Sequence, residues 1–417
     1  MEYINVFIIN HYAIHPSEPG GSRHYSLAKE LAKKGHRVTV VASNFQHGTG
    51  RYNADLGKGK FKEEMIDGIR FVWIAAPGYE GNTVRRFLNM LVFSLRTRFN
   101  KLLKDKRNKP DIIIGSSPHP FASLAAERLA AYHRVPFIME VRDLWPQTLV
   151  DLGRISRFHP LIVFLSWLEK YLYRKASKIV VLLPGASEYI KNLGISEEKV
   201  IWIPNGIDRD LLPDISSIEQ KKKRDLFTVM YAGAHGLANN LDVIINAAKV
   251  LQDEGLADKI LFRLLGEGPE KKNLIMLAKE LGLKNVIFED PVPKKEVYAK
   301  LAEADVFIAV IKKSNLYRWG ISLNKLFDYL AMAKPIVFGV RAFNDPVREA
   351  GAGISVPPED PYALAEAVKE LFRMDPKERE KMGVNGREYV LKNHDFTVLA
   401  SRLEKVLFEV AGDNGLR

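Results

Sequence analysis

Short apolar runs rich in Ile and Val alternate with longer segments of helical periodicity along the whole chain. Such runs are typical of strands buried on both faces, and strands that alternate with helices form parallel sheets. The pattern therefore predicts an α/β protein whose sheets are covered by helices on both sides. The expected strands are INVFIIN, RVTVVAS, IRFVWIA, DIIIGSS, PFIMEV and KIVVLL in a first series, and FTVMYAG, ILFRLLG, NVIFED, DVFIAV and PIVFGV in a second.

The polar stretch SSIEQKKKRD separates the two strand-helix series, which are similar in size. We therefore expect two Rossmann-like domains facing a cleft, an N-terminal one over residues 1–204 and a C-terminal one over residues 205–395. The last segment, 396–417, is one more amphipathic helix, which can cross back and pack on the first domain. Ligands of such sheets bind outside the carboxyl ends of the strands, so we look there for functional residues.

Composition narrows the range of partners. Hydrophobic residues make up 47% and charged residues 27% of the 417 residues, which is typical of a globular protein. The 62 Lys and Arg against 50 Asp and Glu give a net charge of +12, which favours anionic partners such as phosphates, nucleic acid or an acidic membrane surface. The absence of cysteine excludes disulfides, a thiol nucleophile and cysteine metal ligands. The chain begins directly with a strand pattern, so we expect no secretion signal.

The segment GISLNKLFDYLAMAKPIV, residues 320–337, predicts a loop that becomes a helix and ends before a proline. Ser322 is expected to cap this helix, with Asn324 and Lys325 in its first turn and Asp328 on the same face. A helix N-terminus offers unpaired N–H groups and a positive dipole end, which suit a pyrophosphate, and a carboxylate one turn deeper suits sugar hydroxyls. The segment therefore indicates a nucleotide-sugar site, although a surface helix that leads into the buried strand IVFGV fits the same residues.

The loop after the first expected strand carries a second candidate phosphate site. In NHYAIHPSEPGGSRHYSLAKEL, Gly20 and Gly21 precede a helix that Ser22 can cap, and Arg23 begins that helix. Two glycines allow a close approach of the backbone to a phosphate. The spacing is not that of the dinucleotide fingerprint, which argues against NAD. A plain tight turn is the alternative.

Charged residues crowd the ends of the fourth and fifth strands. Glu140, Arg142 and Asp143 follow the fifth strand in MEVRDLWPQTL, where active sites of such sheets lie. Arg142 can also simply pair with either carboxylate. His119 follows the fourth strand, where it can orient a substrate hydroxyl or act as a base, or serve as a structural histidine.

Two glycine-containing loops follow strands of the second series, in MYAGAHGLANNLD and LLGEGPEKKN. Gly233, His235 and Gly266 are expected to face the ligand there, although such loops are also routine connectors. Asp208 and Asp210 resemble a metal-binding pair, but the preceding Asn-Gly turn favours a helix cap. No group of His and carboxylates has metal-ligand spacing, so we expect no metal ion.

The segment 83–107 combines apolar residues at helical spacing with nine basic residues between Arg85 and Lys109 and a single acid. The apolar positions are Leu88, Leu91, Leu95, Phe99 and Leu102. A basic amphipathic helix of this kind is typical of contact with an anionic membrane surface, and a core helix with a solvated basic face is the alternative. No nucleic-acid-binding motif is present, so we expect no nucleic-acid partner.

With these motifs assembled, the chain resembles the bacterial and archaeal retaining glycosyltransferases of family four, which have the GT-B fold. The resemblance runs from about residue 4 to about residue 410 and rests on the order of EPGGSRHYSLAKELAKKGHRVTVVAS, PFIMEVRDLWPQ, KIVVLLPGASEYI, VIWIPNGIDRD, LLGEGPEKKNL and SLNKLFDYLAMAKPIV. EVRDLWP and NKLFDYLA look most like the branch that transfers amino-sugar or deoxy-sugar units in O-antigen or capsule assembly.

The resemblance implies a metal-independent hexosyl or N-acetylhexosaminyl transferase that needs no cofactor. Its donor would be a nucleoside-diphosphate sugar, foremost a UDP-sugar, and its acceptor a lipid-linked glycan. It implies a cytoplasmic protein, peripheral at the inner face of the cell membrane, which fits the basic amphipathic segment.

The sequence departs from the family pattern in its charged residues. Of two glutamates eight positions apart in the family, the second corresponds to Asp328 and the first to Gly320. The usual arginine and lysine after the first strand of the second domain are replaced by Ala234 and Asn239. We expect Lys325, with Arg318 or Lys313, to supply the missing charge.

The expected function is transfer of the sugar with retention of configuration. The expected diphosphate-binding groups are the backbone of Ser322, Leu323 and Asn324, the Lys325 side chain, and Gly20 and Gly21 from the other domain. His119, Glu140, Arg142 and Asp143 would position the transferred sugar and the acceptor, and Asp328 would bind the ribose. The alternatives are a nucleotide-sugar epimerase of the same fold and a non-catalytic partner in a membrane assembly complex.

Overall fold

The computed structural model describes residues 3–18, 22–47, 50–81, 84–151, 155–214 and 226–413. Its contacts divide the chain into two compact units, residues 1–205 together with 396–417, and residues 206–395. We call them the N-terminal unit and the C-terminal unit. The division falls next to the Asn205-Gly206 turn, and the last helix is counted with the N-terminal unit.

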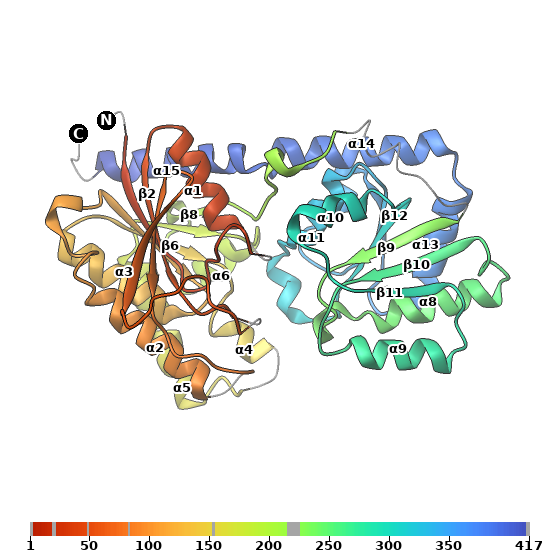
Figure 1. Cartoon of the computed structure of the whole chain (residues 1–417), viewed down its shortest axis with the longest axis horizontal. Coiled ribbons are helices and arrows are strands. Elements are labelled where there is room, and N and C mark those ends of the chain that lie inside the picture. Colours follow the sequence, from red (N-terminus) through yellow and green to blue (C-terminus); the bar gives the residue numbers. More distant parts are fainter. Residues whose placement is uncertain are drawn as a thin grey trace. The chain divides into compact units, whose positions relative to one another are not determined.

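An eight-stranded sheet in the order β3-β4-β2-β1-β5-β6-β7-β8 forms the centre of the N-terminal unit (Figure 1). Each neighbouring pair is parallel except β3 and β4, which form an antiparallel hairpin at the edge. The strands are β1 (Asn5–Ile9), β2 (Arg37–Ser43), β3 (Phe61–Ile66), β4 (Ile69–Ile74), β5 (Ile112–Ser117), β6 (Phe137–Val141), β7 (Lys178–Val181) and β8 (Val200–Trp202).

Helices cover this sheet on both faces. One hydrophobic core joins the inner strands to α1 and α15, while α2, α3 and α5 pack on one another and on the opposite side chains of the strands. The helices are α1 (Arg23–Lys33), α2 (Val84–Arg98), α3 (Pro120–His133), α4 (Gln147–Asp151), α5 (Pro160–Lys175), α6 (Ala186–Asn192) and α15 (Phe396–Asp413).

The C-terminal unit has a six-stranded sheet in the order β11-β10-β9-β12-β13-β14, and all of its strand pairs are parallel. The strands are β9 (Phe227–Ala232), β10 (Ile260–Leu265), β11 (Val286–Glu289), β12 (Val306–Val310), β13 (Ile336–Gly339) and β14 (Gly353–Val356). The helices are α8 (Asp242–Asp253), α9 (Lys271–Glu280), α10 (Lys294–Leu301), α11 (Asn324–Ala331), α12 (Pro346–Ala350), α13 (Pro361–Arg373) and α14 (Pro376–Asn393).

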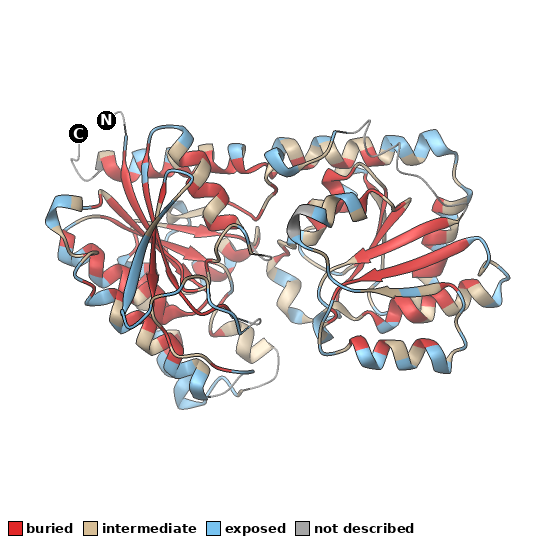
Figure 2. Cartoon of the chain, viewed as in Figure 1, coloured by how far each residue is buried: buried red, intermediate tan, exposed pale blue. Residues whose placement is uncertain are grey.

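The central strands of both sheets are almost entirely buried, as Figure 2 shows by their colour. This burial explains why those strands carry continuous apolar runs rather than alternating ones. The predicted α/β class with two parallel sheets is therefore confirmed. The sequence analysis missed β3, β8 and β14, which lie at sheet edges and are only partly buried.

Two predicted helix boundaries are wrong. The helix expected over 83–107 ends at Arg98, because the side chain of Asn100 accepts hydrogen bonds from the N–H groups of Leu102 and Leu103 and holds a turn there instead. The helix expected to be capped by Ser322 begins at Asn324, and its N-cap residue is Leu323, whose side chain makes no capping hydrogen bond.

Candidate functional site

The carboxyl ends of β9, β10 and β12 bring three chain segments together in the C-terminal unit. They are the loop Gly233–Asn240 after β9, the loop Gly266–Glu270 after β10, and the first turn of α11. We call these three segments the edge loops. Gly233, His235, Gly266, Ser322, Leu323, Asn324, Lys325 and Asp328, all predicted from the sequence to lie at a ligand site, belong to the edge loops or adjoin them.

Lys325 links α11 to the loop after β9. Its ammonium donates to the hydroxyl of Tyr231 at 2.9 Å and to Oδ1 of Asn239 at 2.5 Å. Tyr231 and Asn239 each donate in turn to the carbonyl of Ala234, at 2.8 Å and 2.9 Å. Lys325 therefore reaches the loop in which the family-four arginine and lysine are missing. Its two acceptors, Tyr231 and Asn239, also hold the carbonyl of Ala234 in that loop.

The hydrogen-bond acceptors of Lys325 are neutral, so they do not compensate its charge. Burial lowers the pKa of Lys325 to about 8. An anion bound at this position would raise the pKa of Lys325 again, because it stabilises the protonated amine. The N–H groups of Asn324 and Lys325 at the start of α11 have no partner within the helix, whereas that of Leu326 donates to the carbonyl of Leu323, so the first two add donors and a positive dipole end.

Tyrosines fix the orientation of α11. The hydroxyl of Tyr329 donates to the carbonyl of Ala232 at 2.9 Å and accepts from its N–H at 2.7 Å, which ties the helix to the end of β9. The hydroxyl of Tyr298 in α10 donates to Oδ1 of Asp328 at 2.8 Å. The carboxylate of Asp328 is therefore already oriented before any ligand arrives.

The glycines of the edge loops serve loop packing. A Cβ atom on Gly266 would lie 2.0 Å from the carbonyl oxygen of Gly233, and one on Gly268 would lie 2.4 Å from that of His235. Gly266 therefore lacks a side chain because the neighbouring loop occupies that space, and its facing of the ligand stays a prediction. At Gly233, the atoms that lie against Gly266 are those of the backbone carbonyl.

His235 lies fully buried between these loops. Burial and the nearby charge of Lys271 lower the pKa of the imidazole, so the ring is neutral. Neither ring nitrogen has a hydrogen-bond partner among the described residues. A buried polar group without a partner is uncommon, which marks His235 as a group that a ligand or a loop movement can satisfy.

In the N-terminal unit, two of the expected site residues, Glu140 and Arg23, belong to an internal network together with His24. Oε1 of Glu140 accepts from Nε of Arg23 at 2.8 Å, and Oε2 lies 2.6 Å from Nε2 of His24. All three side chains are about 95% buried. Burial alone would raise the pKa of Glu140, but the charges of His24 and Arg23 outweigh it and hold that pKa well below its usual range.

This network corrects two predictions. Glu140 has both oxygens engaged and is not placed to meet a substrate, so the structure gives it the role of a buried counter-ion. Arg23 does not face a phosphate position either. Its guanidinium donates to the carbonyls of Ile203 and Pro204, immediately before the chain enters the C-terminal unit, as well as to Glu140.

His119 is likewise buried. Its Nδ1 accepts from the N–H of Ala122 and caps α3, and its Nε2 lies 2.5 Å from Nδ1 of His11. Burial and the charge of Arg86 lower the pKa of His119 to about 3. The expectation that His119 contacts the substrate as a base is therefore corrected to the structural alternative: it caps a helix and remains neutral at physiological pH.

The remaining candidates of the N-terminal unit differ in their placement. Arg142 is half-buried, and its N–H donates to Oγ of Ser117 at the end of the neighbouring strand, while the side chain of Asp143 is exposed. Both stay at the carboxyl edge of the sheet. Gly20 and Gly21 lie outside the described residues.

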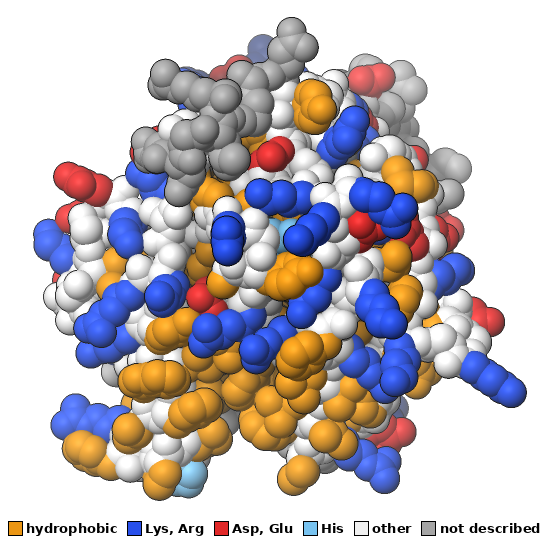
Figure 3. Space-filling view, turned by 90° about the vertical axis from the view of Figure 1, so that its left-hand side faces the viewer, with side chains coloured by type: hydrophobic (Ala, Val, Ile, Leu, Met, Phe, Trp, Pro, Cys, Tyr) orange, Lys and Arg blue, Asp and Glu red, His pale blue; other side chains and the backbone are white. Residues whose placement is uncertain are grey.

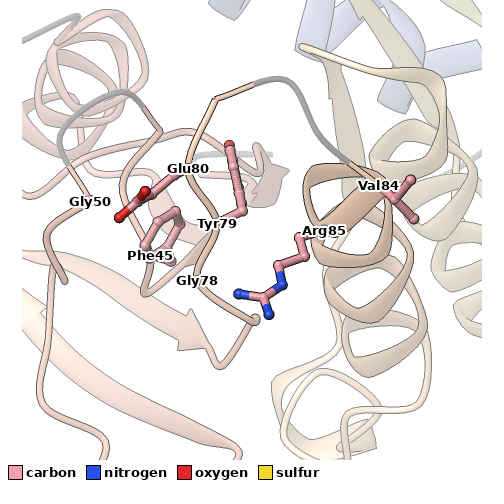
Figure 4. A pocket seen from close by; sticks show the side chains of 7 residues that line it. All are labelled: Phe45, Gly50, Gly78, Tyr79, Glu80, Val84 and Arg85. Atoms are coloured by element: carbon pink, nitrogen blue, oxygen red, sulfur yellow. The ribbon is translucent and has the colours of Figure 1, made fainter.

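A pocket of about 780 Å³ opens at this same edge (Figure 4). Phe45 and Tyr79 come from the loops after β2 and β4, and Arg85 extends from the first turn of α2 toward Gly78. The hydroxyl of Tyr79 is held at 2.8 Å from Nδ1 of His47. The pocket is lined by Phe45, Gly50, Gly78, Tyr79, Glu80, Val84 and Arg85.

Among the described residues, no group of three or more His and carboxylates is arranged to hold a metal ion. Asp208 caps the short 3-10 helix Arg209–Leu211 by accepting from the N–H of Asp210, as the helix-cap interpretation predicts.

Comparison with known proteins shows the family to which the chain belongs. Residues 20–206 match the family described as glycosyl transferase 4-like domain, and residues 214–389 match glycosyl transferases group 1. The chain belongs to the GT-B glycosyltransferases of the family-four type. The resemblance to family-four glycosyltransferases with the GT-B fold is thereby confirmed, while retention and the transferred sugar stay predictions.

Three proteins illustrate the relationship. The putative colanic acid biosynthesis glycosyl transferase WcaI of Escherichia coli is 23% identical over 389 residues, which are 88% of this chain and 91% of WcaI. Sucrose-phosphate synthase of Thermosynechococcus elongatus superposes with a TM-score of 0.76 at 16% identity, over 98% of this chain and all of that one. HepE of Anabaena, solved with UDP and glucose, gives a TM-score of 0.67 at 14% identity over 97% and 99%.

These comparisons establish a glycosyltransferase related to enzymes of polysaccharide biosynthesis, and the solved structures establish the GT-B fold. In this glycosyltransferase, sequence inspection missed the partners that decide each side chain's role. They are Tyr231 for Lys325, Tyr298 for Asp328, His24 for Glu140 and His11 for His119. Only His11 and His24 carried a signal, since both lie in the motif-bearing loop and helix after the first strand.

Proposed function

We propose that this glycosyltransferase moves a sugar from a UDP-sugar to a hydroxyl of a lipid-linked or saccharide acceptor in the assembly of a cell-surface polysaccharide. The edge loops of the C-terminal unit would hold the donor. The observation that carries the proposal is the Lys325 ammonium, buried beside the first turn of α11 and bonded only to neutral oxygens in its described contacts.

The chemistry of the leaving group explains why this arrangement suits transfer. When the bond between sugar and diphosphate breaks, negative charge develops on the diphosphate oxygens. The Lys325 ammonium and the N–H groups at the start of α11 are fixed in advance, so they stabilise that charge without reorganising. Because these groups face the diphosphate, we propose that transfer proceeds without a metal ion.

Asp328 would bind the ribose of the donor. It lies one turn after Lys325 on the same face of α11, and Tyr298 already orients it. HepE, a structural neighbour, was solved with UDP and glucose, which favours uridine as the base. Retention of configuration and transfer of a hexosyl or N-acetylhexosaminyl unit rest on the resemblance to the retaining family.

The pocket of the N-terminal unit is the proposed acceptor site. Phe45 and Tyr79 provide aromatic surface for the apolar face of a sugar ring. Glu80 and Arg85 provide groups that hydrogen-bond hydroxyls or a phosphate. The pocket opens next to the start of α2, within the basic amphipathic segment 83–107 that is proposed to contact an anionic membrane at the inner face of the cell membrane.

A transfer assay tests the proposal. The protein is incubated with radiolabelled UDP-glucose or UDP-N-acetylglucosamine and with lipids extracted from membranes of the source organism. Label that moves into the lipid fraction with wild type, and not with Lys325→Ala, supports the proposal. Release of an epimerised nucleotide sugar without any acceptor would indicate the epimerase instead. Binding of no nucleotide at millimolar concentration would indicate a non-catalytic partner.

A further inference from the structure

The first two turns of helix α5 are apolar on the side that faces the protein and also on the side that faces away, whereas the last turn exposes Arg174 and Lys175. Ile162, Leu165, Leu168 and Leu172 are buried against the N-terminal unit. The outward positions carry Leu161, Val163, Phe164 and Trp167, which are between 37% and 61% exposed, and Phe158 just before the helix is 75% exposed. A helix that is hydrophobic all round is normally enclosed by protein or lipid.

Helices α2 and α5 both pack on α3. Tyr171 of α5 donates to Glu127 of α3 at 3.1 Å, and Phe87 of α2 packs edge-on against Phe121 of α3. Figure 3 shows hydrophobic side chains gathered along the lower edge of this face, at the level where Figure 1 draws α2 and α5. The exposed apolar residues of α2 are Val84, Phe87, Leu88 and Leu95.

Basic residues border this apolar surface. Arg128 and Lys175 lie over the ring of Tyr171, and Arg157 lies over that of Phe158. Between residues 155 and 175 the single acid is Glu169, which is buried. Figure 3 shows Lys and Arg side chains above the hydrophobic edge. Apolar and aromatic side chains rimmed by cations match the interface of an anionic bilayer, where rings sit at the headgroup level and cations meet lipid phosphates.

We propose that α5 is a second membrane-binding helix, which inserts Phe164 and Trp167 into an anionic bilayer while α2 supplies most of the positive charge. The proposal rests on the membrane contact proposed above for residues 83–107 but concerns an element that lies outside them. The positive charge that borders the apolar surface favours an acidic lipid surface over a second copy of this basic chain, whose matching surface would repel it.

The inner side of α5 limits how far the helix can enter the bilayer. Glu169 accepts hydrogen bonds from Tyr173 of the same helix and from Tyr189 of α6, each at 3.0 Å, which fastens α5 to the unit. No helix among the described residues is both long and apolar enough to cross a membrane. The contact is therefore interfacial, with the outward side chains reaching roughly 5–10 Å into the headgroup and acyl boundary.

Vesicle sedimentation tests the proposal. Full-length protein is mixed with vesicles of phosphatidylglycerol and phosphatidylcholine in equal parts, and with vesicles of phosphatidylcholine alone. We expect binding to the anionic vesicles, and we expect Phe164→Ser combined with Trp167→Ser to weaken that binding about tenfold or more. The matched control, Phe343→Ser with Tyr362→Ser, removes exposed rings from the C-terminal unit and should bind like wild type.

Tryptophan quenching by brominated lipids locates the inserted side chain. Trp167→Phe keeps an apolar ring and should bind vesicles normally, yet lose most of the quenching seen with wild type. Equal vesicle binding by the Phe164→Ser/Trp167→Ser variant would overturn the proposal and leave α2 as the membrane contact. Absence of wild-type binding, with self-association that the same double substitution abolishes, would overturn it in favour of a second copy. UDP binding measured without vesicles tests the donor site separately: its absence would contradict the donor assignment and leave the membrane proposal untouched.

Discussion

Arg23 and Lys325 are cations in the first turn of helices that follow buried strands, one in each unit. Arg23 is paired with the carboxylate of Glu140 and donates to two backbone carbonyls, so its charge is compensated inside the protein. The described hydrogen bonds of Lys325 go to neutral oxygens, and burial lowers its pKa to about 8. The two cations occupy equivalent places in the fold and differ in their partners. A cation paired with a carboxylate serves the structure, whereas one whose partners are neutral can still bind an anionic ligand.

The largest effect should follow from removing the partner of Arg23. Glu140→Ala leaves a buried guanidinium without its counter-ion, which should cost about 3–5 kcal/mol of unfolding free energy. Lys325→Ala breaks no ion pair and should cost far less. Urea denaturation of both variants checks this, and equal losses of stability would remove the distinction between the two cations.

The second-largest effect on stability should come from the contact between Gly266 and Gly233 in the edge loops. Gly266→Ala places a methyl group on the carbonyl of Gly233 and should destabilise the protein by about 2–3 kcal/mol. Gly282→Ala is a control for a positive φ without a contact, because Gly282 has φ +62°, against +145° for Gly266, and open space around it, and it should lose only about 1 kcal/mol. Thermal unfolding measures both. Similar losses would mean that backbone conformation, not loop contact, requires the glycine.

The lowered pKa of Lys325 predicts a pH dependence. A diphosphate needs the protonated amine, so UDP affinity should be full below pH 8 and fall by up to about tenfold per pH unit above it. Without ligand the sign is opposite: between pH 8 and 10.5 the unfolded chain binds the extra proton, so this group makes stability rise with pH. Calorimetric titration with UDP at several pH values, in buffers of different ionisation enthalpy, should show proton uptake near pH 8. A flat profile in wild type would contradict the assignment.

The smallest effect concerns Tyr298. Tyr298→Phe removes the hydroxyl that orients Asp328 but keeps the ring, so it should weaken donor binding by about 1 kcal/mol, or several-fold in KM, with little change in kcat. Steady-state kinetics with varied donor concentration separates the two constants. A loss of kcat alone would show that Asp328 acts in the chemical step rather than in ribose binding.

Much of the fold follows from the sequence because apolar runs report burial directly. The central strands were all predicted, whereas β3, β8 and β14 were missed because partly buried edge strands lack such runs. The first turn of α11 was placed correctly at Asn324 and Lys325, although the cap at Ser322 was wrong, since the loop packing around Leu323 is a tertiary effect.

The site is less predictable, because the role of a side chain depends on partners that are distant in sequence. Glu140 meets Arg23 across 117 residues and His119 meets His11 across 108, and neither separation leaves a local pattern. Lys325 and Asp328 could be predicted as donor-binding residues because a helix N-terminus creates a chemical environment within one turn of chain.

The most direct test of the account is a thermal-shift comparison of wild type and Lys325→Ala with UDP, GDP, ADP, TDP and NAD. The account predicts that UDP raises the melting temperature of wild type and that this shift is lost in the variant, whose melting temperature without ligand is nearly unchanged. An equal UDP shift in both proteins, or no shift with any nucleoside diphosphate, would contradict the assignment of Lys325 and the α11 N-terminus to the donor diphosphate.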